Sequence, residues 1–143
     1  MRQVDKMLLD TDMLSEVMKA KDRRVVKTAV AYQSIHTQLT TSVVTVMEIV
    51  KGLQKVGRTD AMNRFLSGLQ FGEVLPFDRS CAEIAGKIYG DLERTGQPIG
   101  RADVMIAAIA ITHDLTLATG NTRHYVRIQA LGYSLRLVNW RKG

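Results

Sequence analysis

The chain has 143 residues, 45% of them hydrophobic and 24% charged, which fits one folded domain over residues 1–143 and excludes a disordered chain. Its longest apolar stretch, residues 104–111, is too short to span a bilayer, and no apolar secretory segment is evident. The single cysteine, Cys81, excludes an internal disulfide. We therefore expect a cytoplasmic protein outside the membrane. The net charge of +6 suits a polyanionic partner such as nucleic acid, and it suits equally a basic protein with no such partner.

Strand and helix patterns alternate through the first part of the chain. A short apolar run at residues 7–9 predicts a strand, and apolar residues at helical spacing predict helices at residues 14–18 and 25–38. The β-branched segment 39–44 predicts a second strand. Residues 45–57 then form a helical pattern that ends at a glycine.

The middle of the chain continues in the same way. Thr59 or Asp60 can cap a further helix, which leads to a third predicted strand at residues 73–77. Asp78 or Ser80 can cap the long helix that follows this strand.

The last part of the chain contains a helix that is apolar on nearly every side. This helix is opened by Asp103 and covers residues 104–111, and such a pattern indicates a buried helix. Residues 115–119 predict a fourth strand, and residues 133–138 predict a last one. Strands that alternate with helices predict a three-layer α/β/α domain with a central, mostly parallel sheet.

Four acid or amide side chains lie where predicted strands end or helices begin. Asp10 ends the first strand, Glu48 lies in the first turn of a helix, Asp103 opens the buried helix, and Asn121 follows the fourth strand. Strand ends and the following helix starts share one edge of a parallel sheet, so these four side chains can converge there. Such a group suits a hard cation such as Mg²⁺ or Mn²⁺, which takes oxygen ligands.

Each acid also has a structural interpretation. Thr45 and Glu48 fit a capping box, and Asp12 fits the N-cap of the first helix. Asp103 fits an ordinary acid in the first turn of a helix. Asp10 has no evident capping role, which favours a chemical role for this residue.

Five segments in this order resemble one known family. They are LLDTD, TSVVTVMEIVKG, GQPIGRADVMIAAIA, LTLATGNTRHY and RLVNW. Through them nearly the whole chain resembles the PIN-domain ribonucleases, and most closely the VapC-type toxins of bacterial toxin–antitoxin pairs. The resemblance implies a compact PIN fold and a metal-dependent endoribonuclease that cleaves RNA by water attack on a phosphodiester.

The resemblance also implies roles for individual residues. Asp10, Glu48 and Asp103 match the acids that hold Mg²⁺ or Mn²⁺, and Asn121 matches a fourth catalytic position that often carries Asp. Thr11, Asp12 and Thr119 match neighbours that orient these ligands. Two departures bear on the metal: position 12 is usually Asn, so Asp12 adds a carboxylate at the rim of the pocket, and neutral Asn121 weakens the case for a second ion.

Contacts with RNA and with protein partners are also expected. Arg101, Arg123 and Arg127 flank the acidic segments and are candidates for RNA phosphates. The histidines His36, His113 and His124 show no motif spacing, so we expect them on the solvated surface. The resemblance further implies tRNA as the substrate, a homodimer, and a VapB-type antitoxin that blocks the acidic pocket.

Two alternatives to the nuclease remain open. One is a haloacid-dehalogenase-like phosphatase that uses Asp10 as its nucleophile and Asp12 as the second acid, although Leu14 stands where that motif needs Thr or Val. The other is a PIN-like module that binds RNA or a partner without cleaving, which the departures at Asp12 and Asn121 keep open.

Overall fold

Short parallel strands organise the fold in the computed structural model, which describes residues 5–142. The strands are β1 (Met7–Leu9), β2 (Thr40–Ser42), β3 (Glu73–Leu75), β4 (Thr116–Ala118) and β5 (Leu137–Val138). They pair in parallel as β1–β4–β5 and as β2–β3. The Thr41 hydroxyl donates to the Leu9 carbonyl oxygen at 3.0 Å and links the two sets. The predicted central parallel sheet is confirmed.

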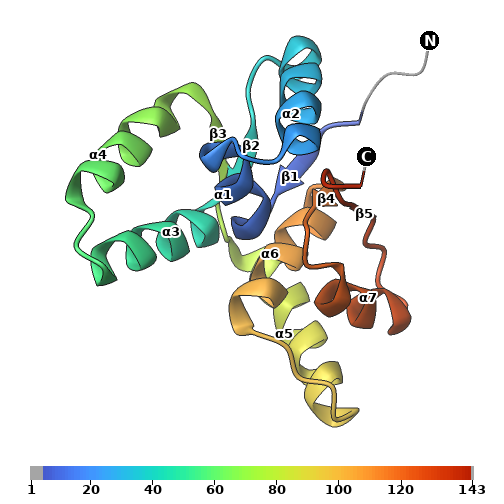
Figure 1. Cartoon of the computed structure of the whole chain (residues 1–143). Helices are drawn as coiled ribbons and strands as arrows, with labels where there is room; N and C mark the ends of the chain where they lie inside the picture. Colours follow the sequence, from blue (N-terminus) through green and yellow to red (C-terminus); the bar gives the residue numbers. More distant parts are fainter. Residues whose placement is uncertain (1–4, 143) are drawn as a thin grey trace.

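Helices cover this sheet on both sides (Figure 1). They are α1 (Thr11–Lys19), α2 (Arg23–His36), α3 (Val43–Lys55), α4 (Thr59–Gly68), the short 3₁₀ helix η1 (Leu69–Phe71), α5 (Arg79–Arg94), α6 (Arg101–Thr112) and α7 (Thr122–Ala130). In Figure 1, α5, α6 and α7 lie together, α1 and α2 lie near the opposite end, and α3 and α4 project as an arm. Over residues 5–142, every helix is too short or too polar to span a membrane.

Two hydrophobic cores lie on opposite faces of the sheet. Leu8 and Leu117 pack in one core with α5 and α6, whereas Leu9 and Ala118 pack in the other with α1 and α2. Successive side chains of a strand point to opposite faces, so β1, β4 and β5 each contribute to both cores. This arrangement confirms the three-layer α/β/α prediction. The predicted buried helix is α6, whose residues 106–110 are all fully buried.

Helix starts and the last strand differ in part from the prediction. Arg58 precedes α4 and no side chain caps that helix, so the predicted caps Thr59 and Asp60 are wrong. Asp78 caps α5 as predicted, accepting from the Cys81 N–H at 3.0 Å. The last strand, predicted at residues 133–138, is β5 and is only two residues long.

The final segment is fixed by side chains more than by strand pairing. Trp140 is 1% exposed and packs in the core with α1 and α2, and its indole N–H donates to the Met7 sulfur at 3.4 Å. Before it, the Arg136 guanidinium donates to the Asp114 carboxylate at 2.8 Å. These contacts hold the C-terminal segment close to β1 and β4.

Because α6 is buried, we expect that shortening one of its side chains lowers the stability of the protein strongly. Replacing fully buried Ile109 by Ala leaves a cavity, and we expect the free energy of unfolding to fall by about 2–5 kcal/mol. Val30→Ala on α2, where the side chain is 64% exposed, serves as the control and should change stability by less than about 0.5 kcal/mol. Urea unfolding followed by circular dichroism measures both, and equal losses would contradict the assigned core.

Candidate active site

Asp10 follows β1 directly and is 3% exposed. Its carboxylate accepts from the Met13 N–H at 2.8 Å, so Asp10 is the N-cap of α1. The prediction that Asp12 caps this helix is therefore wrong, as is the view that Asp10 has no capping role. The cap fixes the carboxylate at the carboxyl end of the sheet, where ligands bind in open α/β folds.

Burial makes the ionised form of Asp10 unfavourable. Desolvation raises the pKa of Asp10 from 3.8 to about 6, and the charges of Asp12 and Asp103 act in the same direction. Hydrogen bonds from the Thr119 hydroxyl and the Met13 N–H oppose the rise. A cation placed beside Asp10 would remove the penalty for its charge.

Tyr125 brings Asp10 and Asp103 to one hydroxyl group. Its buried hydroxyl lies 3.2 Å from Asp103 Oδ1 and 3.5 Å from Asp10 Oδ2. The pKa of Tyr125 lies well above its ordinary value because of burial and the charges of Asp10, Asp103 and Glu48. The neutral phenol therefore acts as a donor to the two carboxylates, which come from different elements, α6 and the end of β1.

His124 completes the surroundings of Asp103. Its Nδ1 lies 2.8 Å from Asp103 Oδ2 and 3.1 Å from the Asn121 side-chain nitrogen. The prediction that His124 has a purely surface role is wrong, because it holds the second oxygen of Asp103. Asn121 is brought to the same place, and its N–H donates to the Thr119 hydroxyl at 2.9 Å.

Glu48 lies on α3, at the edge of this group. Its carboxylate accepts from the Thr11 hydroxyl, which also lies 3.1 Å from the Thr45 hydroxyl. The capping-box interpretation is wrong, because the Thr45 N–H donates to Ser42, which caps α3. Thr11 thus holds Glu48 toward the site.

The donor set fits a single hard cation. Within residues 5–142, no group of three His, Cys, Asp or Glu side chains is close enough to ligate one ion together. Asp10 and Asp103 meet at the Tyr125 hydroxyl, whereas Glu48 is held on α3 by the Thr11 hydroxyl. Mg²⁺ is usually held by one or two carboxylates together with waters, which this pair can provide.

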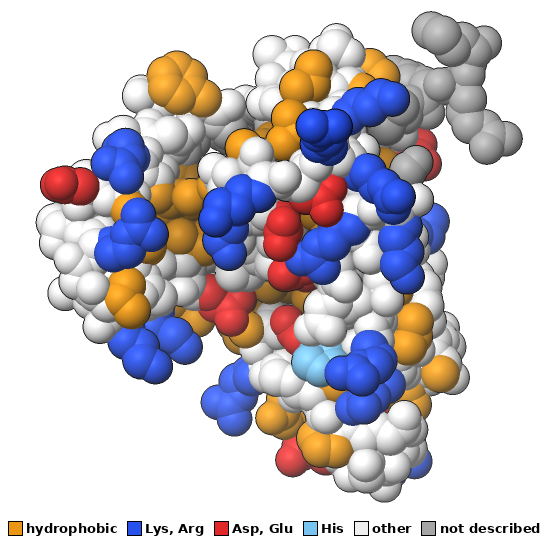
Figure 2. Space-filling view, in the orientation of Figure 1, with side chains coloured by type: hydrophobic (Ala, Val, Ile, Leu, Met, Phe, Trp, Pro, Cys, Tyr) orange, Lys and Arg blue, Asp and Glu red, His pale blue; other side chains and the backbone are white. Residues whose placement is uncertain are grey.

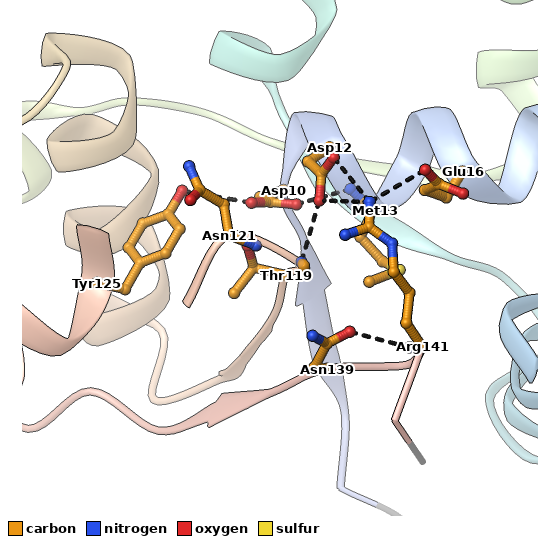
Figure 3. A network of polar contacts seen from close by, with 10 residues as sticks. Asp10, Asp12, Met13, Glu16, Thr119, Asn121, Tyr125, Asn139 and Arg141 are labelled. Carbon is orange, nitrogen blue, oxygen red and sulfur yellow. Dashed lines mark hydrogen bonds and ion pairs between the residues drawn. The ribbon is translucent and has the colours of Figure 1, made fainter. Parts of the chain in front are cut away.

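Asp12 lies between Asp10 and Arg141, and its contacts run to the C-terminal segment and to the turn after β4 (Figure 3). Its Oδ2 accepts from the Gly120 N–H at 3.1 Å, and its two oxygens lie 3.0 and 3.1 Å from an Arg141 nitrogen. The same nitrogen lies 3.0 Å from Glu16. The extra charge expected at the rim of the pocket is thus paired within the chain.

Acidic side chains lie in a hollow in the middle of the face shown in Figure 2, with Lys and Arg side chains around them. Among the predicted RNA contacts, Arg101 and Arg123 are exposed, and Arg101 lies over the Tyr89 ring at 5.7 Å. Arg127 donates to the Pro98 carbonyl oxygen at 3.1 Å, so part of its donor capacity supports the loop before α6.

Three side chains of the site escaped prediction. His124 and Tyr125 stand three and four residues after Asn121, a spacing that places all three on one face of a helix and could have indicated them. Arg141 lies 129 residues from Asp12, and no local pattern connects the two residues.

The PIN domain family model matches residues 7–130 of this chain. A VapC ribonuclease of Sinorhizobium fredii is 36% identical over 80% of this chain and 86% of that protein. A tRNA(fMet)-specific endonuclease VapC of Shigella flexneri is 31% identical over 88% of this chain and 94% of that protein. A chain in the crystal structure of DNA-bound VapBC from Salmonella typhimurium superposes with a TM-score of 0.80 at 28% identity, covering 96% of this chain and 99% of that chain.

The chain therefore belongs to the PIN-domain family and, within it, to the VapC ribonucleases. The fold and the family resemblance predicted from the sequence are both confirmed. The phosphatase alternative is set aside by this assignment.

The buried charge of Asp10 predicts that Asp10→Asn stabilises the metal-free protein. Asparagine can keep the cap on Met13 without a charge. The folded-state pKa is raised, so the penalty is fully present above about pH 6 and absent below pH 3.8. With EDTA at pH 7.5, we expect the free energy of unfolding of the variant to exceed that of the natural chain by about 2–3 kcal/mol.

Urea unfolding at several pH values measures this difference. The advantage of Asp10→Asn should shrink as the pH falls from 6 and vanish below about pH 4. Asp60→Asn, at an exposed acid on α4, is the control. A variant less stable than the natural chain at pH 7.5 in EDTA would contradict the assigned burial.

The shared hydroxyl predicts a second stability effect. Tyr125→Phe removes the donor between Asp10 and Asp103, and we expect a loss of about 1–3 kcal/mol in EDTA. Mn²⁺ should stabilise this variant at least as much as the natural chain, because the ion replaces the missing donor. Thermal melts with EDTA or Mn²⁺ test this, with Tyr133→Phe as control, since that hydroxyl contacts Asp91 at 2.7 Å instead. A variant that gains nothing from Mn²⁺ would argue against the ion at this pair.

Proposed function

We propose that this chain is the toxin of a toxin–antitoxin pair and cleaves RNA as an endoribonuclease dependent on Mg²⁺ or Mn²⁺. The observation that carries the proposal is the convergence of Asp10 and Asp103, from separate elements, on the Tyr125 hydroxyl. Membership among the VapC ribonucleases supports the reaction class. We also propose a cytoplasmic location, where RNA substrates are found.

The residues divide the work as follows. Asp10 and Asp103 would hold the divalent ion, which when bound supplies positive charge to the phosphodiester under attack. Glu48, held by Thr11, would orient the attacking water. Thr119 and Asn121 lie in the turn after β4. The Thr119 hydroxyl bonds Asp10 and accepts from the Asn121 N–H, and the Asn121 side chain contacts His124. Family similarity implies products with 5′-phosphate and 3′-hydroxyl ends.

The substrate we propose is tRNA. Similar proteins from Shigella flexneri and Salmonella typhimurium are named as tRNA(fMet)-specific endonucleases, at 31% and 29% identity. Exposed Arg101 and Arg123, together with Arg127, would contact phosphates around the acidic hollow.

The partner we propose is a VapB-type antitoxin, because structures of VapBC complexes superpose on this chain. A groove of about 640 Å³ between α1, α3 and α4 offers an apolar lining, including Leu14, Met18, Ile49, Leu53, Phe65 and Phe71. Met18 is 48% exposed, whereas Met13 is fully buried and therefore outside this groove. An amphipathic helix of the antitoxin suits such a groove. A homodimer is also proposed, and sedimentation velocity tests it.

Cleavage of a tRNA pool tests the function. With Mn²⁺ the purified chain should give discrete fragments, and EDTA should abolish them. Asp10→Asn, which keeps the helix cap, should leave the RNA intact even when Mn²⁺ is present.

Ligation-based mapping of the fragment ends identifies the bond that is cut. RNA that is bound but never cleaved would favour the alternative of a non-cleaving PIN-like module. Asp60→Asn, on the distant helix α4, should cleave like the natural chain.

A further inference from the structure

Arg141 is the most heavily bonded cation near the candidate site. One of its nitrogens lies 3.0 and 3.1 Å from the two oxygens of Asp12 and 3.0 Å from Glu16. Its own backbone is held on two sides, by the Asn139 side chain at 2.9 Å and by the Arg24 guanidinium at 3.1 Å. The guanidinium is thus fixed where it is, with 32% of the side chain exposed.

The same contact reaches the turn after β4. Asp12 accepts from the Gly120 N–H as well as from Arg141, so it joins the C-terminal segment to that turn. Arg141 also packs directly on Gly120: a Cβ there would lie 2.1 Å from a guanidinium nitrogen and 2.5 Å from Asp12 Oδ2. Gly120 separates Thr119, which bonds Asp10, from Asn121, which contacts His124.

We propose that Arg141 is a positioning residue that neutralises Asp12 and sets the turn at residues 119–121, so that Asp12 does not compete with Asp10 and Asp103 for the divalent ion. This inference rests on the proposed function. It explains how the chain carries Asp12 so near to Asp10, with Arg141 on its other side (Figure 3). A planar guanidinium suits this place because it binds several carboxylate oxygens at once.

If Arg141 only anchored the C-terminal segment, its replacement would have a different effect on metal binding and cleavage. Loss of an anchor loosens the segment and lowers metal binding and cleavage together. Loss of a neutralising cation leaves Asp12 and Glu16 unpaired beside Asp10, which attracts a divalent ion more strongly but in the wrong geometry. Tighter metal binding combined with slower cleavage is therefore the signature of the proposed role.

The experiment compares Arg141→Gln with the natural chain at fixed ionic strength, using Mn²⁺ as the probe. We expect Arg141→Gln to bind Mn²⁺ about 3–10-fold more tightly by electron paramagnetic resonance titration. Cleavage of tRNA at saturating Mn²⁺ should fall by about 10-fold or more. Arg136→Gln is the matched control, because Arg136 also pairs with an aspartate, Asp114, but at the opposite end of β4.

Two further variants separate charge from anchoring. In the double variant Asp12→Asn/Arg141→Gln the unpaired charge on Asp12 is absent, so the Mn²⁺ affinity should return to within about twofold of the natural value. Arg141→Lys keeps the positive charge and should also retain a near-natural affinity. Thermal melts show whether each variant is folded, and Arg141→Met, which removes the charge but keeps an aliphatic stem, replaces Arg141→Gln if that variant does not fold.

Three outcomes would overturn the inference. Arg141→Gln could behave like Arg136→Gln, or lose metal binding and cleavage together, or bind Mn²⁺ no differently from the double variant. In each case the natural chain still binds Mn²⁺ and cleaves RNA, so the proposed function stands. A natural chain that neither binds Mn²⁺ nor cleaves RNA would remove both proposals.

Discussion

The parallel register of β1 against β4 is the constraint on which the candidate site depends. Leu9 pairs with Ala118, and the Asp10 N–H donates to the Ala118 carbonyl oxygen at 3.1 Å. The pairing of the two strands alone therefore brings together the residues that follow them, Asp10 and Thr119. A slip of one residue would turn Asp10 into the opposite face of the sheet and place Leu9 at the crevice.

That register imposes an electrostatic cost on the folded chain. Asp10 is buried, and the charges of Asp12 and Asp103 raise its pKa further. Neutral donors soften the cost, since Met13, Thr119 and Tyr125 each offer a hydrogen bond. A buried carboxylate of this kind lowers the stability of the folded chain. Such a group is expected at a site that binds a ligand, where function requires the charge.

Sequence reasoning recovered the features that follow from local pattern. The strands at 7–9 and 115–119, the buried α6 and the approach of Asp103 to Asp10 all follow from periodicity and parallel topology. The caps of α1, α3 and α4 were wrongly assigned, because several residues near each helix start can accept the same N–H, whereas Asp78 caps α5 as predicted. The contact of His124 with Asp103 depends on how α7 packs against α6, which no local pattern specifies.

The two aspartates of the D-x-D segment show why spacing alone does not assign a role. Asp10 is the N-cap of α1, so its side chain turns back over the helix start and into the crevice. Asp12 is two residues farther along, inside the first turn, and helical rotation carries its side chain toward Gly120 and the C-terminal segment. Among residues 5–142, the carboxylate of Asp12 is paired with Arg141, whereas that of Asp10 is buried and has a raised pKa. The difference between a candidate ligand and a structural acid thus comes from a single half-turn of helix and from a cation that the end of the chain supplies.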